Sequence, residues 1–383
     1  MASRRLDKFK SEKKLKSAVT VECASVTSIE EVDDAADNHS IKIPRRQSGG
    51  RKRVWFSYSL GACLTVLAII FGVGFRERTS RYLYGRESKE DPFGNWGKPG
   101  TGTEDLAWYP HDFLQDVIPV PCHSHNDYWR KVPLFSAIYA GCTGVEADVW
   151  LQNGDLLVGH DEGSLQVNRT LQSLYIDPLV EILARQNPTT PFYNGTKNGI
   201  FSTDPAETLV LLIDFKTDGP ETWPLVTKQL APLRDKGWLS YSKDGEFYQG
   251  PVTVVGTGNT PFDLIIGGNS TRRDIFFDAP LDQLDQSPYN STNSYYASVS
   301  FWDAIGAVWW KGEPNDGQMA RIREQLKAAH DRGLKARYWK LPSWPIHVRN
   351  RIWEVLVEEG IDMLNVDDLA AATRQDWTTP DTF

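Results

Sequence analysis

Short runs of apolar and β-branched residues alternate with longer helix-like segments throughout residues 117–366. This alternation predicts strands connected by crossover helices, as in a parallel sheet. Eight candidate strands in about 250 residues fit a closed (β/α)8 TIM-type barrel, although a doubly wound open sheet has the same local rhythm. The candidate strands are Val117–Cys122, Gly144–Trp150, Leu209–Phe215, Val252–Gly256, Asp274–Phe277, Ala297–Phe301, Ala336–Trp339 and Met363–Val366. The candidate helices are Leu134–Ala140, Leu179–Arg185, Trp223–Lys236, Asp316–Arg332 and Ile346–Glu359.

Residues 54–75 form a run of 22 residues without a single charged side chain. At about 1.5 Å per residue, a helix of this length covers roughly 33 Å, enough for the hydrocarbon core of a bilayer. The run therefore predicts a transmembrane helix. The fold class that we expect is α/β, with a single (β/α)8 TIM-type barrel after one N-terminal transmembrane helix.

Basic residues crowd the N-terminal side of this apolar run more than its C-terminal side. The positive-inside rule then predicts a single-pass protein with a cytosolic N-terminus and a lumenal or extracellular barrel in the secretory pathway. A mitochondrial membrane is less favoured, because Asp7 and Glu12 interrupt what should be an acid-poor presequence. The basic residues before the run are Arg45, Arg46, Arg51, Lys52 and Arg53, and those after it are Arg76, Arg78 and Arg81.

Composition divides the rest of the chain into segments. Residues 1–53 are polar and lack apolar periodicity, which predicts a disordered cytosolic tail. Residues 76–107 are rich in Gly, Pro and Thr towards their end and predict a stem, and residues 108–383 are the expected barrel domain. A lumenal barrel would make its glycosylation sequons usable, so we expect a glycoprotein. The sequon asparagines are Asn168, Asn194, Asn269 and Asn290.

The net charge of −8 is unevenly distributed along the chain. Residues 1–53 carry a balance of +5, so residues 54–383 carry a balance of −13. A domain this acidic is a poor candidate for binding nucleic acid, because that affinity depends on Lys and Arg neutralising phosphates. The four cysteines are too few and too scattered for a disulfide scaffold or a zinc cluster.

Polar residues gather at the expected carboxyl ends of the first strands. Barrel enzymes build their active sites at this rim, from several strand ends that converge. Glu146 and Asp148 lie two residues apart and therefore on one face of their strand, and Asp214 and Lys216 repeat this spacing. The candidate site residues are His123, His125, Asn126, Glu146, Asp148, His160, Asp214 and Lys216.

These residue types suit metal-assisted cleavage of a phosphodiester. Carboxylate and amide oxygens are ligands that Ca²⁺ or Mg²⁺ takes, two histidines provide a general acid and a general base, and a lysine holds a phosphate oxygen. Each element also has a purely structural interpretation, as a hydrogen-bonded histidine, an exposed acidic face or a salt bridge at the rim. Burying several charges together is costly without a metal or ligand, so the set as a whole favours a site.

Four motifs resemble signatures of phospholipase-C-like phosphodiesterases. Ser-His-Asn-Asp-Tyr at 124–128 resembles Ser-His-Asn-Thr-Tyr of eukaryotic phosphoinositide phospholipases C, and Val-Glu-Ala-Asp-Val-Trp at 145–150 resembles their Leu-Glu-Leu-Asp-Cys-Trp. Val-Gly-His-Asp at 158–161 is similar to the second-histidine motif of glycerophosphodiester phosphodiesterases, and Leu-Ile-Asp-Phe-Lys-Thr at 212–217 to the Asp-Leu-Lys-Thr strand of spider sphingomyelinase D. With the ending Met-Leu-Asn-Val-Asp-Asp-Leu, the pattern resembles the fungal altered inheritance of mitochondria protein six family over about residues 115–372.

The resemblance implies a role for each candidate residue. It makes His125 and His160 the catalytic histidines and gives Lys216 a phosphate-binding role. His123 is ambiguous, because other branches place the first histidine two residues earlier. The implied ligands of the divalent cation are Asn126, Glu146, Asp148 and Asp214.

Three functions stay open on this basis. We expect a metal-dependent phosphoric diester hydrolase that acts on a phospholipid or glycerophosphodiester by histidine acid–base catalysis. The alternative is a non-catalytic lumenal protein that keeps the barrel and binds a ligand or Ca²⁺. A glycan-directed enzyme is the third, with tryptophans stacking on sugars. The tryptophans in question are Trp302, Trp309, Trp310, Trp339 and Trp344.

Two of the cysteines flank the first expected helix. Cys122 should lie near the top of the first strand and Cys142 near the bottom of the barrel, after that helix. A five-residue strand separates those levels by roughly 16 Å. This is beyond the reach of a disulfide, so we predict two free thiols.

Overall fold

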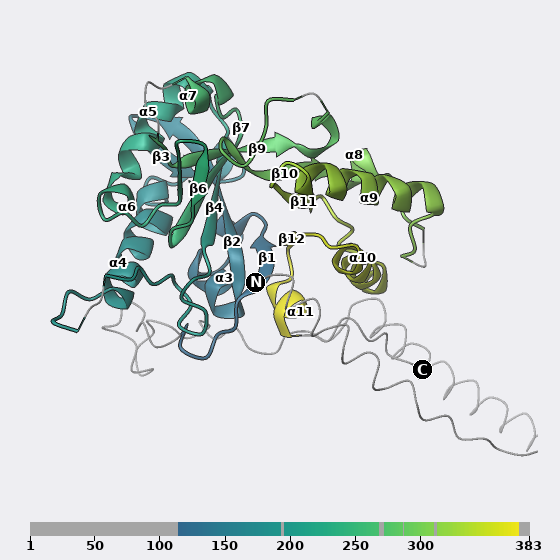
Figure 1. Cartoon of the computed structure of the whole chain (residues 1–383), viewed down its shortest axis with the longest axis horizontal. Helices are drawn as coiled ribbons and strands as arrows, with labels where there is room; N and C mark the ends of the chain where they lie inside the picture. The colour runs from purple at the N-terminus through teal and green to yellow at the C-terminus, as the bar shows by residue number, and fades with distance from the viewer. Residues whose placement is uncertain (1–113, 193–194, 268–271, 286, 310–311, 375–383) are drawn as a thin grey trace, which may run out of the picture. The chain divides into compact units, whose positions relative to one another are not determined.

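Eight parallel strands close into a barrel in the part of the chain that the computed structural model describes, residues 114–192, 195–267, 272–285, 287–309 and 312–374 (Figure 1). Closure comes from the first strand, which pairs with both the second and the last. This confirms the closed barrel over the open sheet. The strands, in order round the barrel, are β1 (Val120–Ser124), β2 (Cys142–Gln152), β4 (Leu209–Phe215), β7 (Val252–Gly258), β9 (Ile275–Pro280), β10 (Ser294–Ser300), β11 (Lys335–Trp339) and β12 (Met363–Val366).

Helices cover the outside of the barrel, with α4, α5 and α6 on one side of the strands and α9 and α10 on the other (Figure 1). Each predicted strand and helix has a counterpart, with one division. The predicted helix 223–236 is two helices, because Pro232 lies in the first turn of the second and cannot donate a backbone hydrogen bond. The helices are α3 (Phe135–Ala140), α4 (Asp177–Gln186), α5 (Gly219–Gln229), α6 (Ala231–Asp235), α7 (Phe262–Ile266), α8 (Phe301–Ala304), α9 (Asp316–His330), α10 (Ile346–Glu358) and α11 (Leu369–Arg374).

Some short elements extend this pattern and were not predicted. Strand β3 (Asp155–Val158) turns back from the end of β2 and pairs with it in the antiparallel direction. A small second sheet contains β5 (Tyr241–Lys243), β6 (Glu246–Tyr248) and β8 (Arg272–Arg273). The single-turn elements are η2 (Asp127–Trp129), η3 (Glu162–Ser164), η4 (Gln172–Ile176) and η5 (Leu281–Gln283).

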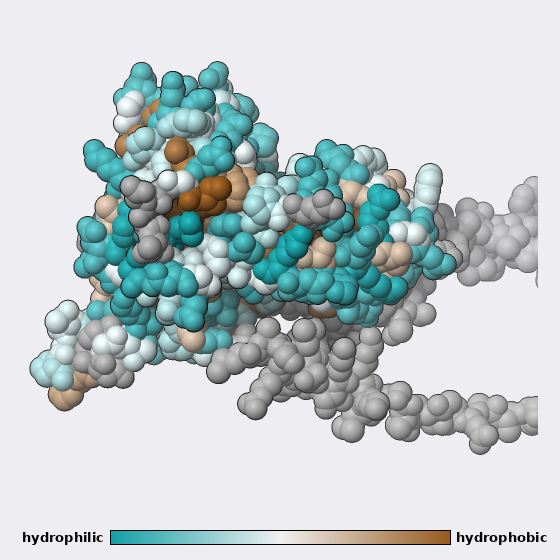
Figure 2. Space-filling view, turned by 45° about the horizontal axis from the view of Figure 1, so that its top comes forward, coloured by the Kyte–Doolittle hydropathy of each residue, from teal (hydrophilic) through white to brown (hydrophobic). Residues whose placement is uncertain are grey.

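The core has two parts because successive side chains of a strand point to opposite faces. The outward-facing side chains pack against the helices in one large cluster. The inward-facing side chains of Val210, Leu212, Val255 and Phe276 belong to a smaller, separate cluster. The visible face of the molecule is mainly hydrophilic, with hydrophobic residues confined to small areas (Figure 2).

The predicted N-terminal segments lie outside the described residues. These are the tail 1–53, the transmembrane helix 54–75 and the stem 76–107. Among the helices of the described part, none has the length and apolar character needed to cross a bilayer.

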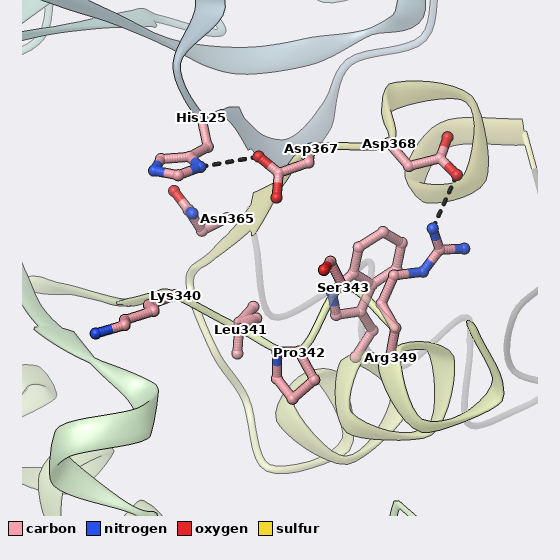
Figure 3. A pocket seen from close by; sticks show the side chains of 10 residues that line it. His125, Lys340, Leu341, Pro342, Ser343, Arg349, Asn365, Asp367 and Asp368 are labelled. Carbon is pink, nitrogen blue, oxygen red and sulfur yellow. Dashed lines mark hydrogen bonds and ion pairs between the residues drawn. The ribbon is translucent and has the colours of Figure 1, made fainter. Parts of the chain in front are cut away.

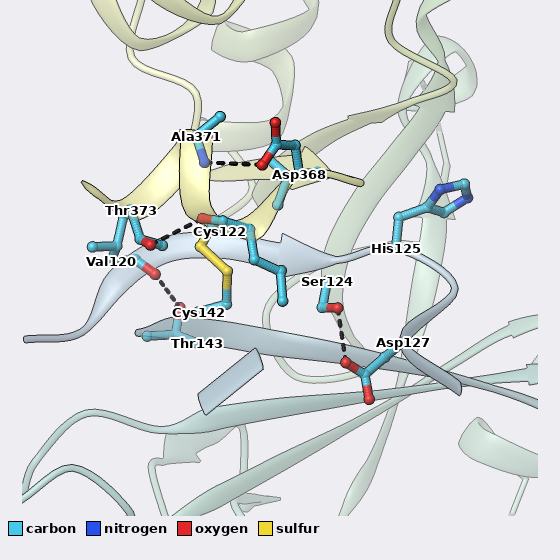
Figure 4. Close-up of a disulfide and its surroundings, with 12 residues drawn as sticks. Val120, Cys122, Ser124, His125, Asp127, Cys142, Thr143, Asp368, Ala371 and Thr373 are labelled. Carbon is cyan, nitrogen blue, oxygen red and sulfur yellow. Dashed lines mark hydrogen bonds between the residues drawn. A yellow bond between two sulfur atoms is a disulfide. The ribbon is translucent and has the colours of Figure 1, made fainter. Parts of the chain in front are cut away.

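The prediction of two free thiols is wrong, because Cys122 and Cys142 form a disulfide (Figure 4). Strand β1 starts three residues later than predicted, so Cys122 lies in its middle and not at its top. Strand β2 starts two residues earlier, so Cys142 is its first residue and is the parallel partner of Val120. The two Cα atoms are therefore only 4.8 Å apart.

Candidate active site

The loop after β1 is held by a buried carboxylate. Asp127 accepts hydrogen bonds from the Ser124 hydroxyl at 2.8 Å, from the Leu134 backbone N–H and from the Tyr175 hydroxyl at 3.1 Å. Just before it, Asn126 has a φ of 49° in the left-handed region, which Asn tolerates better than most residues. This turn directs the residues after β1 across the carboxyl end of the barrel.

Three carboxylates meet at this end of the barrel. Strands β2 and β4 pair so that Asp148 lies directly beside Asp214, and Glu146 lies two residues earlier on the same face. One oxygen from each of the three lies within 4.8 Å of the others. Glu146 also accepts the backbone N–H of Asn126 at 2.9 Å, which joins the loop to the cluster.

Lys216 brings a positively charged side chain to this cluster. Its Nζ donates to Asp214 Oδ2 at 2.6 Å and lies 3.0 Å from Asp148 Oδ2. Space for the Asp214 carboxylate depends on Gly258, where an added Cβ would lie 2.0 Å from Asp214 Oδ1. Lys216, the predicted phosphate-binding residue, thus lies in the site, and in this structure its amine contacts two carboxylates.

Tyr128 lies at the centre of the site. Its hydroxyl oxygen is 2.6 Å from Asn126 Oδ1, 2.8 Å from Asp148 Oδ2 and 3.1 Å from His160 Nδ1. A phenol has one hydrogen and cannot donate to both oxygens at once. Burial, with the charge and hydrogen bond of Asp148, raises the pKa of Tyr128 far above its usual value, so the phenol stays protonated.

Burial and mutual repulsion favour the protonated forms of the acids. Burial and the charge of Glu146 raise the pKa of Asp148 to about 7, although Lys216 acts in the opposite direction. Burial also raises the pKa of Asp214 despite Lys216. Burial acts to lower the pKa of Lys216, but Asp214 and Asp148 outweigh it and raise that pKa. In the metal-free cluster, Lys216 therefore does not offset the effect of burial and of the neighbouring carboxylates on the pKa values of Asp148 and Asp214.

The residues present fit a hard divalent cation. Asp148 Oδ1 is buried and has no hydrogen-bond partner among the described residues. The other donors in reach are carboxylate and amide oxygens, the type that Ca²⁺ and Mg²⁺ prefer. Glu146, Asp148, Asp214 and Asn126 are thus together as predicted, with a charge and an unpaired oxygen that a cation would satisfy.

His160 lies on the β2–β3 side of the cluster. The Trp150 indole holds its loop by donating to the Gly159 carbonyl at 2.7 Å. His160 Nδ1 is 3.7 Å from Asp148 Oδ2, and its half-exposed ring is 4.8 Å from the ring of Trp129. The predicted second histidine is therefore at the acids and open to solvent.

His125 lies on the β1–β12 side, where its Nδ1–H donates to Asp367 Oδ1 at 2.8 Å. Burial acts to lower the pKa of His125, but the hydrogen bond to Asp367 and the charges of Glu146 and Asp367 outweigh it and raise that pKa. Arg130 fixes this corner by donating to the backbone carbonyls of Asp367 at 2.6 Å and Val366 at 3.2 Å. His125 is only partly exposed, and Nε2 is the ring nitrogen that Asp367 does not engage.

His123, the ambiguous candidate, lies inside the barrel. It is fully buried, and neither ring nitrogen has a hydrogen-bond partner among the described residues. Its Nδ1 would lie 2.5 Å from a Cβ added at Gly144, and its ring packs edge-on against Tyr296. Burial, with Arg337 and His125 nearby, lowers the pKa of His123 well below its usual value, so the ring is neutral.

A pocket of about 220 Å³ opens beside His125 (Figure 3). Figure 3 shows Asn365 and Asp367 near His125, with Lys340 and Ser343 on the loop after β11 and Arg349 on α10. Arg349 donates to Asp368 at 2.8 Å and thereby fixes one wall. The pocket has both polar and apolar lining residues and borders a candidate catalytic histidine.

Sequence reasoning gave no role to Tyr128 or Asp367. Both stand inside motifs that were noted, Tyr128 at the end of Ser-His-Asn-Asp-Tyr and Asp367 in Met-Leu-Asn-Val-Asp-Asp-Leu. The position of Asp367 directly after the last strand was a usable signal, since carboxyl ends of barrel strands converge. Its pairing with His125 depends on barrel closure, which no local pattern records.

A closed parallel barrel that carries an acid cluster and two histidines at its carboxyl end has the residue types that metal-assisted phosphodiester cleavage needs. A family model described as "AIM6-like phosphodiesterase domain" matches residues 111–278. The chain is 44% identical over 282 residues to "Altered inheritance of mitochondria protein 6 homolog" of Arthroderma benhamiae, covering 71% of this chain and 88% of that relative. It is 38% identical over 281 residues to "Altered inheritance of mitochondria protein 6" of Saccharomyces cerevisiae, covering 68% and 71%. The chain belongs to the altered inheritance of mitochondria protein 6 family.

One solved structure with a similar arrangement of its chain is that of a glycerophosphodiester phosphodiesterase from Parabacteroides distasonis. It covers 67% of this chain and 96% of its own, with a TM-score of 0.38 and 11% identity. At this TM-score the likeness adds nothing to the barrel assignment, which rests on the strand order.

Proposed function

We propose that this chain is a metal-dependent phosphodiesterase that acts on a phospholipid or glycerophosphodiester by histidine acid–base catalysis. The main support is that two histidines approach one acid cluster from different strands, each with its own partner. His160 lies at Asp148 and Tyr128, and His125 is held by Asp367. A binding protein has no need of two such histidines.

Proton transfer falls to atoms that the site leaves accessible. His125 exchanges its proton through Nε2, because Asp367 engages Nδ1 and orients the ring. His160 supplies the partner function from the β2–β3 side, with Tyr128 fixing its position through Nδ1. His123 takes no part in this scheme, since it is fully buried inside the barrel.

Charge stabilisation comes from the acid cluster and the lysine beside it. A divalent cation held by Asn126, Glu146, Asp148 and Asp214 would neutralise a phosphate oxygen and lower the pKa of a bound hydroxyl or water. Lys216 lies against two of these carboxylates and can turn to a phosphate oxygen on the same face. The pocket beside His125 offers room for one substituent of the phosphodiester.

A direct test compares matched histidine variants of the full-length chain on a panel of phospholipids and soluble phosphodiesters. His160→Ala should abolish turnover with little effect on cation binding, because the histidine is not a ligand. EDTA should abolish turnover in the unmodified chain. The matched control is His330→Ala, since His330 also pairs with an aspartate, Asp362 at 2.7 Å, but lies at the end of α9.

Equal turnover by the His160→Ala variant and the unmodified chain would refute the proposed catalysis. Tight Ca²⁺ binding without hydrolysis of any substrate would favour the non-catalytic binding protein instead.

We also propose that residues 54–75 anchor the chain in a membrane of the secretory pathway, with the barrel on the lumenal or extracellular side. Disulfides persist mainly in oxidising compartments, so the Cys122–Cys142 bond supports this side. The sequon residues Asn168 and Asn290 are exposed, as glycosylation requires. The other two sequons, at 194 and 269, lie outside the described residues.

A further inference from the structure

Exposed hydrophobic side chains of the described residues concentrate at one end of the barrel. Eleven large hydrophobic side chains are exposed in the described part, and eight of them lie at or after the ends of β1, β3, β7, β10 and β11. Those segments also border the candidate active site. We name the eight the aromatic rim: Trp129, Val167, Leu264, Ile266, Trp302, Trp309, Trp339 and Trp344.

Four of the tryptophans lie at or after the ends of two neighbouring strands, β10 and β11. Ser300 at the end of β10 pairs with Trp339 at the end of β11, and Trp302 follows Ser300 by two residues. Trp309 and Trp344 lie in the loops that follow these same strands. Trp129, in the loop after β1, contacts the candidate catalytic residue His160. The aromatic rim therefore borders the site on more than one side.

Exposing these tryptophan side chains to water is unfavourable in free energy. Their exposed fractions run from 39% for Trp339 to 84% for Trp309. Gathered exposed apolar groups on a soluble protein mark a binding surface. Tryptophan in particular prefers the boundary between lipid and water, where the ring is buried and the indole N–H stays solvated.

We propose that the aromatic rim docks on the surface of a phospholipid bilayer and holds the mouth of the site against lipid headgroups. This inference rests on the proposed phosphodiesterase function and on the proposed anchor, which supplies the bilayer. It adds the face by which the barrel meets that bilayer and the residues that make the contact.

The chain length between anchor and barrel permits this orientation. Thirty-eight residues separate Phe75 from Leu114. They span at most about 130 Å, whereas a folded domain of this size is about 45 Å across. A tether of that reach raises the effective concentration of the bilayer at every face of the barrel, which favours the bilayer over a second protein copy.

Tryptophan emission of the full-length chain reports the contact. The chain is reconstituted in phosphatidylcholine vesicles with and without brominated acyl chains, which quench nearby indoles. The test variant is W302Q/W309Q/W339Q/W344Q, and Trp129 is kept because it touches His160. The control I118Q/F192Q/Y248Q removes the three exposed hydrophobic side chains that lie away from the rim. Trp55, within the apolar run, and the retained Trp129 are common to all proteins and give the background.

The variant should lose most of the quenching above this background, and the control should keep it. Trp309→Gln alone should lose its own share, which guards against misfolding of the quadruple variant. The quadruple variant should also keep turnover of a soluble phosphodiester and lose most turnover of vesicle lipid.

Equal quenching in the variant and the unmodified chain would overturn the proposal. A dimer in detergent that becomes a monomer in the variant would assign the rim to a second copy and would also overturn it. Rim-dependent quenching without hydrolysis of any substrate would refute the phosphodiesterase function but support the docking surface.

Discussion

His125 receives its raised pKa from a carboxylate at the far end of the domain sequence. Burial acts against the protonated ring, and Asp367 supplies both a hydrogen bond and a charge that reverse the effect. In turn, burial acts to raise the pKa of Asp367, but His125 and Arg130 lower it below the usual value. The two residues thus behave as one acid–base unit.

Removing that carboxylate charge should lower the pKa of His125 in the metal-free protein. With Asp367→Asn, less negative charge opposes the effect of burial on the His125 pKa, so the imidazole loses its proton at a lower pH. Titration of the histidine ring signals by NMR measures the change. Asp362→Asn is the matched control, because it alters the partner of His330 and not that of His125. An unchanged His125 pKa in Asp367→Asn would contradict the assignment.

Cation binding should depend on pH through Asp148. Its pKa is raised to about 7, so below that value the metal-free site holds a proton that the cation must displace. Affinity for Ca²⁺ or Mg²⁺ should fall by up to about tenfold per pH unit as the pH drops from about 7 to about 5. Calorimetry in buffers of different ionisation enthalpy measures both the affinity and the released proton. A constant cation affinity over this pH range would argue against a proton on Asp148 that the cation must displace.

The same pKa shift has a consequence for stability. A group whose folded-state pKa is raised stabilises the fold at low pH, and this contribution is lost as the pH rises through about 7. The contribution of Asp148 to the stability of the metal-free protein should therefore decrease as the pH rises from weakly acidic to neutral. Denaturant titrations at several pH values, compared with Asp148→Asn, isolate this contribution. Identical pH profiles in the two proteins would contradict it.

At the scale of elements, one glycine at the end of β7 makes room for the acid cluster. Gly258 has a φ of 64°, and a Cβ there would strike Asp214 Oδ1. Gly258→Ala should therefore weaken cation binding, besides costing about 1 kcal/mol of backbone strain. Gly245→Ala is the matched control, because Gly245 has a φ of 85° but nothing lies within 4 Å of the added methyl group. Equal cation affinities in the two variants would contradict the steric explanation.

The disulfide joins two adjacent strands, β1 and β2. Its cysteines are 20 residues apart, and closing a loop of that size restricts the unfolded chain by about 3 kcal/mol. Replacing both cysteines by alanine should lower the free energy of unfolding by that order, as measured in denaturant. Alkylation without reductant should modify Cys23 and Cys63 only, as read by intact mass. Modification of Cys122 and Cys142 under those conditions would contradict the bond.

Strand positions were predictable from sequence where burial is uniform. The run Leu209–Phe215 is apolar apart from Asp214, and the observed strand has these bounds. The error at Cys122 and Cys142 came from ends that shifted by two or three residues and from neglecting that neighbouring strands pair side by side. Such small shifts decide whether two cysteines meet, and local propensity does not fix them.

The clustering of the candidate site residues was predictable because they lie at the carboxyl ends of neighbouring strands. Glu146, Asp148 and Asp214 are together, and His160 is beside them. The central place of Tyr128 was not predictable, because it depends on the turn at Asn126. The burial of His123 likewise follows from the register of β1, which only barrel closure reveals.

For the whole molecule, the proposed lumenal side predicts glycan at Asn168 and Asn290, which are exposed in the described part. The chain expressed in a eukaryotic cell should shift in mobility on glycosidase treatment. Asn168→Gln and Asn290→Gln should each reduce the shift, and protease added to intact microsomes should remove only the tail. Loss of the whole barrel to that protease would contradict the orientation.

The closure of the barrel also bears on how the protein is made. His125 and Asp367 are 242 residues apart in sequence, and Arg130 joins their two strand ends. Ribosomes release the first strand long before the last, so a growing chain carries the acids and His160 without the completed histidine–aspartate pair. Translation must reach the final strand before this corner exists. A chain stalled short of it lacks the Asp367 partner that orients His125, so the proposed acid–base chemistry depends on completion of the last strand.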